Sequence, residues 1–228
     1  MSQNRLRALV VSAAATLATC VPPAHAAGAG AATCPSFPQG YGGSSQLVTV
    51  EPAQAPTFAK LTLWTRRGSC WVRAAGPWTA RTGRNGLSSH HREGDGTTPI
   101  GAFGIEPVMY GLAPDPGVRY RYHRLVCGDW WDEDPTSPAY NRFQHVPCGA
   151  QPSFGGGSEA LWRATTAYQS FAVLSYNADP VVPGRGSAIF VHATTGRATT
   201  GCVSLPLAEL DRLLRWLDPA LKPIVSIV

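Results

Sequence analysis

Frequent glycine and proline is the feature that most restricts what this chain can fold into. The sequence holds 24 glycines and 20 prolines among 228 residues, so turns are many and the segments between them are short. Hydrophobic residues make up 44% of the chain and charged residues 14%. This composition supports an ordinary folded core and excludes disorder driven by net charge. No run approaches the length of apolar sequence that an ordinary membrane-spanning helix needs.

The first 26 residues have the pattern of an export signal. Two arginines precede a short apolar run over 8–18, and the Ala-His-Ala of 24–26 offers a small-x-small cleavage pattern. Lipid anchoring at Cys20 is the alternative, although threonine directly before that cysteine is unusual for a lipoprotein signal. Removal of the signal lowers the net charge from +5 to +3, which is too weakly basic to predict a nucleic-acid partner. The sequence thus predicts a protein secreted to the cell envelope.

The cysteine count matters because an exported chain meets an oxidising compartment. Cleavage of the signal leaves five cysteines, so at least one thiol has no partner within the chain. Sequence does not fix the connectivity, but Cys34 and Cys70 bracket the N-terminal segment, and Cys127 and Cys148 flank one irregular insert. We expect these two disulfides. Cys202 is then free, either as a reactive thiol or as an inert buried one.

The mature chain suits one domain with one core. We expect residues 27–45, rich in Gly, Ala and Ser, to be a flexible N-terminal segment and residues 46–228 to form the single domain. Alternating or short apolar segments predict β-strands at 47–50, 59–64, 70–74, 102–105, 171–177, 187–192 and 224–228. The predicted strands do not alternate regularly with helices, so the sequence does not predict a parallel sheet.

Two segments have helical spacing. Ser158 as an N-cap, with Glu159 in the first turn, predicts a helix near 158–170. A second helix is predicted to start at Pro206 and to stop at Asp218-Pro219. Its leucines are expected to form one buried face, namely Leu207, Leu210, Leu213, Leu214 and Leu217. The sequence therefore predicts a β-rich α+β fold.

Residues 110–157 form a long insert that is dense in Pro, Gly, Trp and Asp and shows no steady period. Structureless loops of this length are uncommon in compact domains and are often functional. We expect its disulfide-closed part, 128–147, to act as a lid or wall over a cleft. Its aromatic residues Trp130, Trp131 and Tyr140 either line a substrate groove or fill a small core within the insert. The acidic run 132–134 is interpreted as an exposed loop in preference to a cation site.

The chemistry is predicted near the end of the chain. His192 ends an apolar strand, and a polar loop returns from it to Cys202 ten residues later. A cysteine nucleophile needs a nearby base or cation, and imidazole is the usual partner. Gly201 lets the backbone approach a substrate and aim N–H groups at a developing oxyanion. The alternative is a structural thiol beside a core histidine.

These residues resemble the L,D-transpeptidase catalytic domain, a family of peptidoglycan cross-linking cysteine enzymes. The strand that ends in His192, the Thr-x-Gly-Cys segment 199–202 and the Leu-rich helix carry the resemblance. Further matching segments follow in the expected order, at 92–103, 140–141, 176–177 and 186–190. The resemblance covers roughly residues 83–228.

The chain departs from the commonest family pattern at three points. The spacing from histidine to cysteine is shorter, Thr200 replaces a histidine just before Gly-Cys, and Ser204 replaces an asparagine or arginine two residues after the cysteine. It is similar to a divergent, short-loop branch of the family.

The resemblance implies a curved sheet or sandwich with a helix after the cysteine, and a role for each site residue. Cys202 would attack the stem-peptide carbonyl before the terminal D-alanine, and His192 would take the thiol proton. A carbonyl at Ala193 or Thr194 would orient the imidazole ring. The N–H groups of Gly201 and Cys202, with Thr200, would form the oxyanion hole.

The resemblance further implies a thioester that a second stem resolves to a 3→3 cross-link. The expected partners are peptidoglycan stems, and we expect a monomer that uses no cofactor or metal. An L,D-carboxypeptidase or amidase, and a non-catalytic wall-binding module, are the rival interpretations. The intact pair of Cys202 and His192 argues against the module.

Other polar residues receive modest roles. His90 and His91 are adjacent and without further zinc-like spacing, so both are expected to be exposed to solvent. Asp95 is expected to be a turn residue. Tyr176 is expected to lie in the core, whereas Asn177 at the end of that strand is a candidate for the groove.

Overall fold

The computed structural model describes residues 35, 37, 41–155 and 157–228. The predicted export signal, Cys20, Cys34 and most of the segment 27–45 lie outside these residues. The pairing of Cys34 with Cys70 and the boundaries of the signal therefore stay predictions. Among the described residues, no helix is long and apolar enough to cross a membrane.

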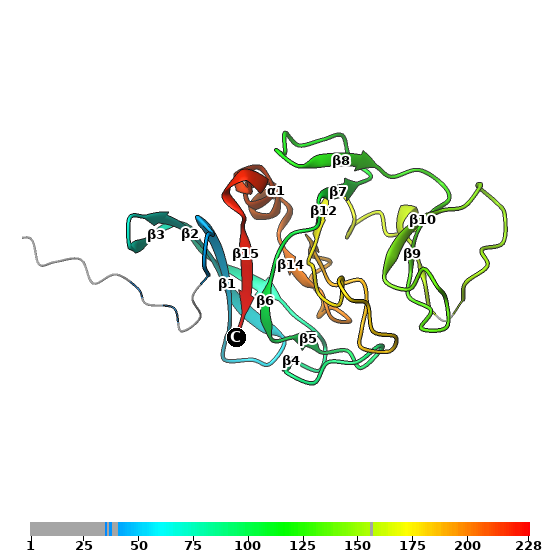
Figure 1. Ribbon diagram of the computed structural model, residues 1–228, viewed down its shortest axis with the longest axis horizontal. Coiled ribbons are helices and arrows are strands. Elements are labelled where there is room, and N and C mark those ends of the chain that lie inside the picture. The colour runs from blue at the N-terminus through cyan, green and yellow to red at the C-terminus, as the bar shows by residue number, and fades with distance from the viewer. Residues whose placement is uncertain (1–34, 36, 38–40, 156) are drawn as a thin grey trace, which may run out of the picture. The chain divides into compact units, whose positions relative to one another are not determined.

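The described residues form a β-rich structure in which a ten-stranded curled sheet dominates (Figure 1). The strand order in that sheet is β6-β15-β1-β2-β3-β14-β13-β12-β7-β8. A three-stranded sheet, β10-β9-β11, and a two-stranded sheet, β4-β5, complete the architecture. The strands are β1 (Gln46–Pro52), β2 (Phe58–Arg67), β3 (Cys70–Arg81), β4 (Leu87–Ser88), β5 (Thr98–Pro99), β6 (Gly101–Phe103), β7 (Val108–Gly111), β8 (Arg121–Arg124), β9 (Asp129–Asp132), β10 (Arg142–His145), β11 (Glu159–Ala160), β12 (Phe171–Val173), β13 (Phe190–Ala193), β14 (Val203–Leu205) and β15 (Ile224–Ile227).

The large sheet is mixed. The pairs β1–β15, β13–β14 and β7–β8 are parallel, whereas the other neighbours in it are antiparallel. The parallel pairs were not predictable from local sequence, because each forms between segments that lack regular strand–helix alternation. The β13–β14 pair is the important one for function, since it places Val191 opposite Val203 and His192 opposite Ser204.

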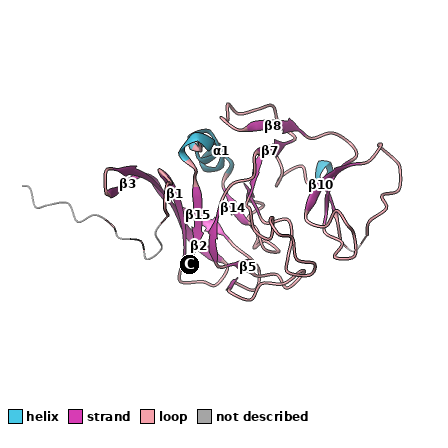
Figure 2. Cartoon of the chain, viewed as in Figure 1, coloured by secondary structure: helices cyan, strands magenta, loops and turns pink. Residues whose placement is uncertain are grey.

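Within the described residues, the one α-helix is α1 (Leu207–Trp216), which Figure 2 shows beside the sheet. It begins after Pro206, as predicted, because proline suits a position whose N–H has no helical partner. Leu210, Leu213 and Leu214 are buried on its inner face. Leu207 is 45% exposed, so the prediction that it belongs to the buried face is wrong. It stands at the first turn, where the helix has not yet reached the core.

The predicted helix near 158–170 is wrong. Residues 159–160 instead form β11, which pairs with β9, and a single 3₁₀ turn (Leu161–Arg163) follows. Leu161 and Tyr168 are nevertheless buried. The apolar spacing therefore reflects burial in an irregular segment. Backbone N–H and C=O groups at the start of this segment bond to β9, so they are not available for helical hydrogen bonds.

The insert has its own framework. Cys127 and Cys148 form a disulfide, which is the pairing expected from the sequence. Inside it, β9 and β10 pair antiparallel. The Asp129 carboxylate, which has no exposed surface, accepts hydrogen bonds from His123 Nε2 at 2.8 Å and His145 Nδ1 at 2.7 Å. The insert is therefore a structured small sheet in place of a loose loop.

Candidate functional site

The two faces of β12, β13 and β14 bury different residues. Side chains alternate across a strand, and one face joins the core beneath α1, with Ala172, Val191, Ala193, Val203 and Leu205. The other face joins a second core beneath the insert, with Phe171, Val173, Phe190 and Cys202. Trp131 of β9 closes this second core, since its ring packs edge-on against Phe190 at 5.1 Å between centroids.

Cys202 lies just before β14 on the insert side of the sheet. Cys202 is a free cysteine, and 7% of its surface is exposed. Sγ accepts a hydrogen bond from the Phe190 N–H at 3.4 Å and donates to the Ala188 carbonyl at 3.2 Å. Burial raises the pKa of the Cys202 thiol well above its usual range, and nearby Glu159 and Glu133 raise it further against the smaller opposing effect of the Phe190 N–H. The resting group is therefore a neutral thiol.

His192 lies on β13 on the same face as Cys202, because it is two residues from Phe190 and opposite Ser204. Its Nδ1 bonds to the Ala193 carbonyl oxygen at 2.8 Å. A carbonyl only accepts, so Nδ1 carries the hydrogen and Nε2 of the neutral ring is the free base. Burial lowers the pKa of His192 to about 4, although the Ala193 bond opposes this. The ring is thus neutral near pH 7 and able to accept a proton.

The structure brings Cys202 and His192 to one face of adjacent parallel strands. The hydrogen bonds among the described residues do not include one between the thiol and the imidazole. The Tyr168 ring lies edge-on to His192 at 5.7 Å between centroids. Ser204, across the ladder from His192, has a buried Oγ without a hydrogen-bond partner.

His91 is buried, with 7% exposure, so the prediction that it is exposed is wrong. Its Nδ1 lies 3.1 Å from Asp95 Oδ1 and 3.0 Å from Thr97 Oγ1. Gly186, at φ +109°, leaves room for the ring, because a Cβ there would lie 2.4 Å from it. Asp95 is therefore more than a turn residue, since it helps to fix His91. His90 is exposed, as expected.

A small cavity of about 60 Å³ opens onto Cys202. The thiol and His91 line it, together with three glutamates, Glu93, Glu133 and Glu159. No sequence motif points to these three residues as part of the site. Glu93 precedes the Gly-Asp-Gly loop, whereas Glu133 lies in the acidic run for which the sequence predicts an exposed loop. Asp132 of that run has no exposed surface, so the exposed-loop interpretation is wrong for it.

The oxyanion candidates lie in the turn before Cys202. Thr200 and Gly201 both line the small cavity. The Gly201 N–H donates to Thr199 Oγ1 at 3.2 Å, so it would have to exchange that bond to serve an oxyanion. The Ala193 carbonyl oxygen accepts the hydrogen bond from His192 Nδ1, which is the contact expected of Ala193 or Thr194.

The aromatic groove candidates are dispersed. Trp131 is core, and Trp130 packs against Phe154 and Trp162 within the insert. Tyr140 is 3% exposed; its hydroxyl donates to Glu93 and accepts from the Gly186 N–H. The choice left open by the sequence is therefore resolved toward packing for the two tryptophans, while Tyr140 contacts a residue of the cavity.

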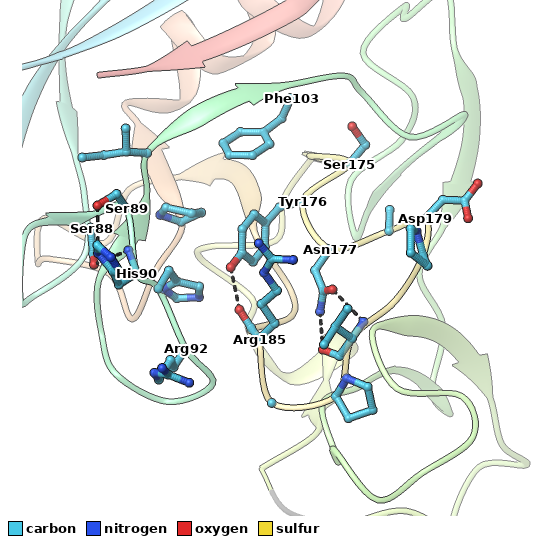
Figure 3. Close-up of a pocket in the computed structure, with 18 residues that line it drawn as sticks. Ser88, Ser89, His90, Arg92, Phe103, Ser175, Tyr176, Asn177, Asp179 and Arg185 are labelled. Atoms are coloured by element: carbon cyan, nitrogen blue, oxygen red, sulfur yellow. Dashed lines mark hydrogen bonds between the residues drawn. The ribbon is translucent and has the colours of Figure 1, made fainter.

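A larger groove of about 820 Å³ adjoins this site and shares His91 with the small cavity. Figure 3 shows Tyr176, Asn177 and Arg185 along it, with the Tyr176 hydroxyl donating to the Arg185 carbonyl. Asn177 lines this groove, and its amide bonds to the backbone of Val182 and Gly186. Its contact with a substrate stays a prediction. It shapes the groove wall by holding the loop 177–186 in place.

The described residues contain no group of three or more His, Cys, Asp or Glu side chains arranged to hold a metal ion.

Comparison with known families gives one finding. A family model described as YkuD, the L,D-transpeptidase catalytic domain, matches residues 53–225. No curated protein and no solved structure matches the chain. The matched range contains every strand from β2 to β14, with Cys202, His192 and the whole insert-side core described above.

Proposed function

Because this chain belongs to the YkuD family of L,D-transpeptidase catalytic domains, we propose that it is an exported enzyme that forms 3→3 cross-links in peptidoglycan. Cys202 is the nucleophile and His192 is its general base. Membership of the family indicates a peptidoglycan-modifying enzyme that depends on a cysteine. The observation that supports the proposed catalytic pair is that Cys202 and His192 share one sheet face, while the bond of His192 Nδ1 to Ala193 leaves Nε2 as the basic nitrogen.

The proposed reaction begins with the donor stem. The neutral thiol turns from the Ala188 carbonyl toward His192, which removes its proton as Sγ attacks the carbonyl carbon before the terminal D-alanine. Backbone N–H groups at 200–202 stabilise the oxyanion. D-Alanine leaves with the proton that His192 returns, and a thioester remains on Cys202. The side-chain amine of a second stem then displaces sulfur.

The buried thiol gives His192 a necessary part in this sequence. A thiol whose pKa is raised by burial is not a preformed thiolate, so the proton must be removed as the S–C bond forms. His192 is neutral near pH 7 because burial lowers its pKa to about 4. The two groups together therefore support general-base catalysis better than they support a stable thiolate–imidazolium pair.

Mass spectrometry of the purified protein with tetrapeptide stems tests the proposal. The expected results are an acyl adduct on Cys202 and 3→3 dimers among the products. The control variant Cys202→Ser should lose the thioester adduct and the dimers. Trimmed tripeptides without dimers would identify a carboxypeptidase, and the absence of any adduct or product would contradict catalysis on these stems.

A further inference from the structure

The cavity at Cys202 is unusual in its charge. Glu93, Glu133 and Glu159 all line it, whereas no lysine or arginine of the described chain does. The family chemistry begins with loss of a proton from a thiol, and carboxylates beside sulfur oppose that step. An acidic lining is therefore a disadvantage for the nucleophile by itself, and it needs a second purpose or a structural explanation.

The hydrogen bonds explain two of the three carboxyl groups only in part. Glu93 Oε2 accepts from Ser187 Oγ at 2.6 Å and from the Tyr140 hydroxyl. Glu159 Oε2 accepts from the Tyr168 hydroxyl. Glu133 differs, because its Oε1 is fully enclosed and has no hydrogen-bond partner among the described residues. A buried carboxyl oxygen without a partner is costly, so this atom offers an acceptor to a donor that enters the cavity.

We propose that Glu133, assisted by Glu159, binds the ammonium group of the acceptor stem and removes its proton before the amine attacks the Cys202 thioester. This inference rests on the proposed function and assigns a base to its second half-reaction. The insert supplies Glu133 directly after β9, and Glu159 begins the neighbouring strand β11. The small sheet therefore contributes chemistry as well as a wall.

The strength of the base suits this task. An ordinary glutamate is far too weak a base to deprotonate an alkylammonium efficiently. Burial, followed by the charges of Glu159, Glu93 and Asp132, raises the pKa of Glu133 to about 9. Proton transfer from an ammonium of similar pKa is then nearly balanced in free energy. Burial also raises the pKa of Glu159, against the effect of the Tyr168 bond, so the two carboxyl groups are expected to share a proton until a cation enters.

Entry of the ammonium first displaces to solvent the proton that Glu133 holds, because a nearby cation lowers the pKa of a carboxyl group. The ammonium then gives one proton to the Glu133 carboxylate and becomes a neutral amine. Its nitrogen forms a bond to the thioester carbonyl carbon, and the C–S bond breaks. The second proton of nitrogen passes through His192 to sulfur, which restores the thiol and leaves a neutral amide. Glu133 keeps the proton that it accepted after the product departs, because its pKa without a cation is about 9, and the next ammonium displaces it.

The test compares two acceptors for the same acyl-enzyme. The tetrapeptide stem brings an amine that is charged at neutral pH, whereas hydroxylamine is weakly basic and mostly uncharged. Glu133→Gln keeps the shape of the side chain and removes the base. We expect resolution by the stem to slow at least about 10²-fold, while resolution by hydroxylamine stays within about threefold of the parent. Glu159→Gln should show a smaller change of the same kind.

The control is Glu51→Gln, which makes the same chemical change at an exposed position of β1. It should leave both rates as in the parent. If Glu133→Gln slows both acceptors equally, or neither, the carboxyl pair is structural and the inference is wrong. An unaltered ratio of the two rates in both cavity variants would have the same meaning.

A second measurement does not depend on variants or on turnover. Two methanethiosulfonate reagents of similar size, the cationic aminoethyl and the anionic sulfonatoethyl forms, are timed against Cys202 in the unaltered protein. The reference is the ratio of the two reagents' rate constants with mercaptoethanol. We expect the ratio for Cys202 to favour the cationic reagent over this reference by at least about tenfold. Equal preference would overturn the inference even if the variants do not fold. Should no stem acylate Cys202, the proposed function fails, and this ratio still decides whether the cavity selects a cation.

Discussion

The two faces of β12–β14 show how one set of strands serves two different demands. Toward α1, the side chains are aliphatic and meet Leu210, Leu213 and Leu214, all of which are almost fully buried. Toward the insert, the same strands present Cys202, His192 and Ser204 among aromatic rings. The helix face gains stability from apolar burial, whereas the insert face keeps buried polar groups that are costly to hold. The proposed catalytic residues thus lie on the face whose packing is the less favourable.

The largest expected effect is on the insert face. His192→Ala should slow acylation of Cys202 by about 10²–10⁴-fold, since a general base contributes that much. His91→Ala, which removes a ring that lines the cavity, should cost less. In the parent, the acylation rate should fall as the pH drops through about 4, where His192 becomes protonated. Rates are measured by intact-mass spectrometry. A larger loss in His91→Ala than in His192→Ala would show that His192 is not the general base.

The helix face should respond in stability alone. Leu214→Ala removes a fully buried side chain, so the free energy of unfolding should fall by about 2–5 kcal/mol. The acylation rate per folded molecule should stay within about twofold of the parent, because Leu214 lies on the side of the sheet away from Cys202. Thermal unfolding and active-site titration measure the two quantities. A matched loss of acylation would show that the faces are coupled more tightly than their separate cores suggest.

The disulfide affects the insert more than the main sheet. The double variant Cys127→Ser/Cys148→Ser opens a loop closed over a separation of 21 residues, for which loop entropy predicts at most about 3 kcal/mol. The loss should be smaller, because Asp129 still joins His145, within the loop, to His123, which precedes it. Hydrogen exchange should rise in β9 and β10 while β1 and β2 stay protected. Uniform exchange across both sheets would mean that the insert and the main sheet unfold together.

The smallest expected effect has the opposite sign. The folded pKa of Glu133 is raised from 4.5 to about 9, so between these values the folded protein holds a proton that the unfolded chain releases. This costs stability increasingly as the pH rises over that range. Glu133→Gln removes the cost and should raise the Tm at pH 8 by a few degrees, about 1 kcal/mol, with little change near pH 4. A lower Tm at pH 8, with Glu51→Gln neutral, would show that the carboxyl group stabilises the fold.

Trimming the insert would not separate these effects. The sequence predicts that 128–147 is a lid or wall over a cleft, which makes shortening this segment an obvious experiment. In the structure, however, Trp131 belongs to the insert-side core and packs on Phe190. Removal of the insert would therefore expose that core, so single substitutions are the better experiment. Its role as a lid or wall stays a prediction, and Glu133 gives that role a specific residue.

Much of the fold could be predicted where the signal is local. Alternation over 47–50 and 59–64 predicted strands that are observed as β1 and β2, and the leucine spacing after Pro206 predicted α1. The same reasoning failed at 158–170, because burial of Leu161 and Tyr168 occurs at helical intervals without a helix. Periodicity reports which residues are buried, and it gives the backbone conformation only when hydrogen bonding agrees.

By itself, the sequence determined the kinds of groups available: a cysteine after glycine, a histidine at the end of an apolar segment, and two cysteines at the ends of the insert. Only the tertiary structure decided which groups meet. His91 reaches the cavity because Gly186, far along the chain, leaves space for its ring. Glu93, Glu133 and Glu159 converge on Cys202 from separate segments, and no local pattern encodes that convergence. The raised pKa values of Glu133 and Glu159 have the same origin, because burial exists only once the chain has folded.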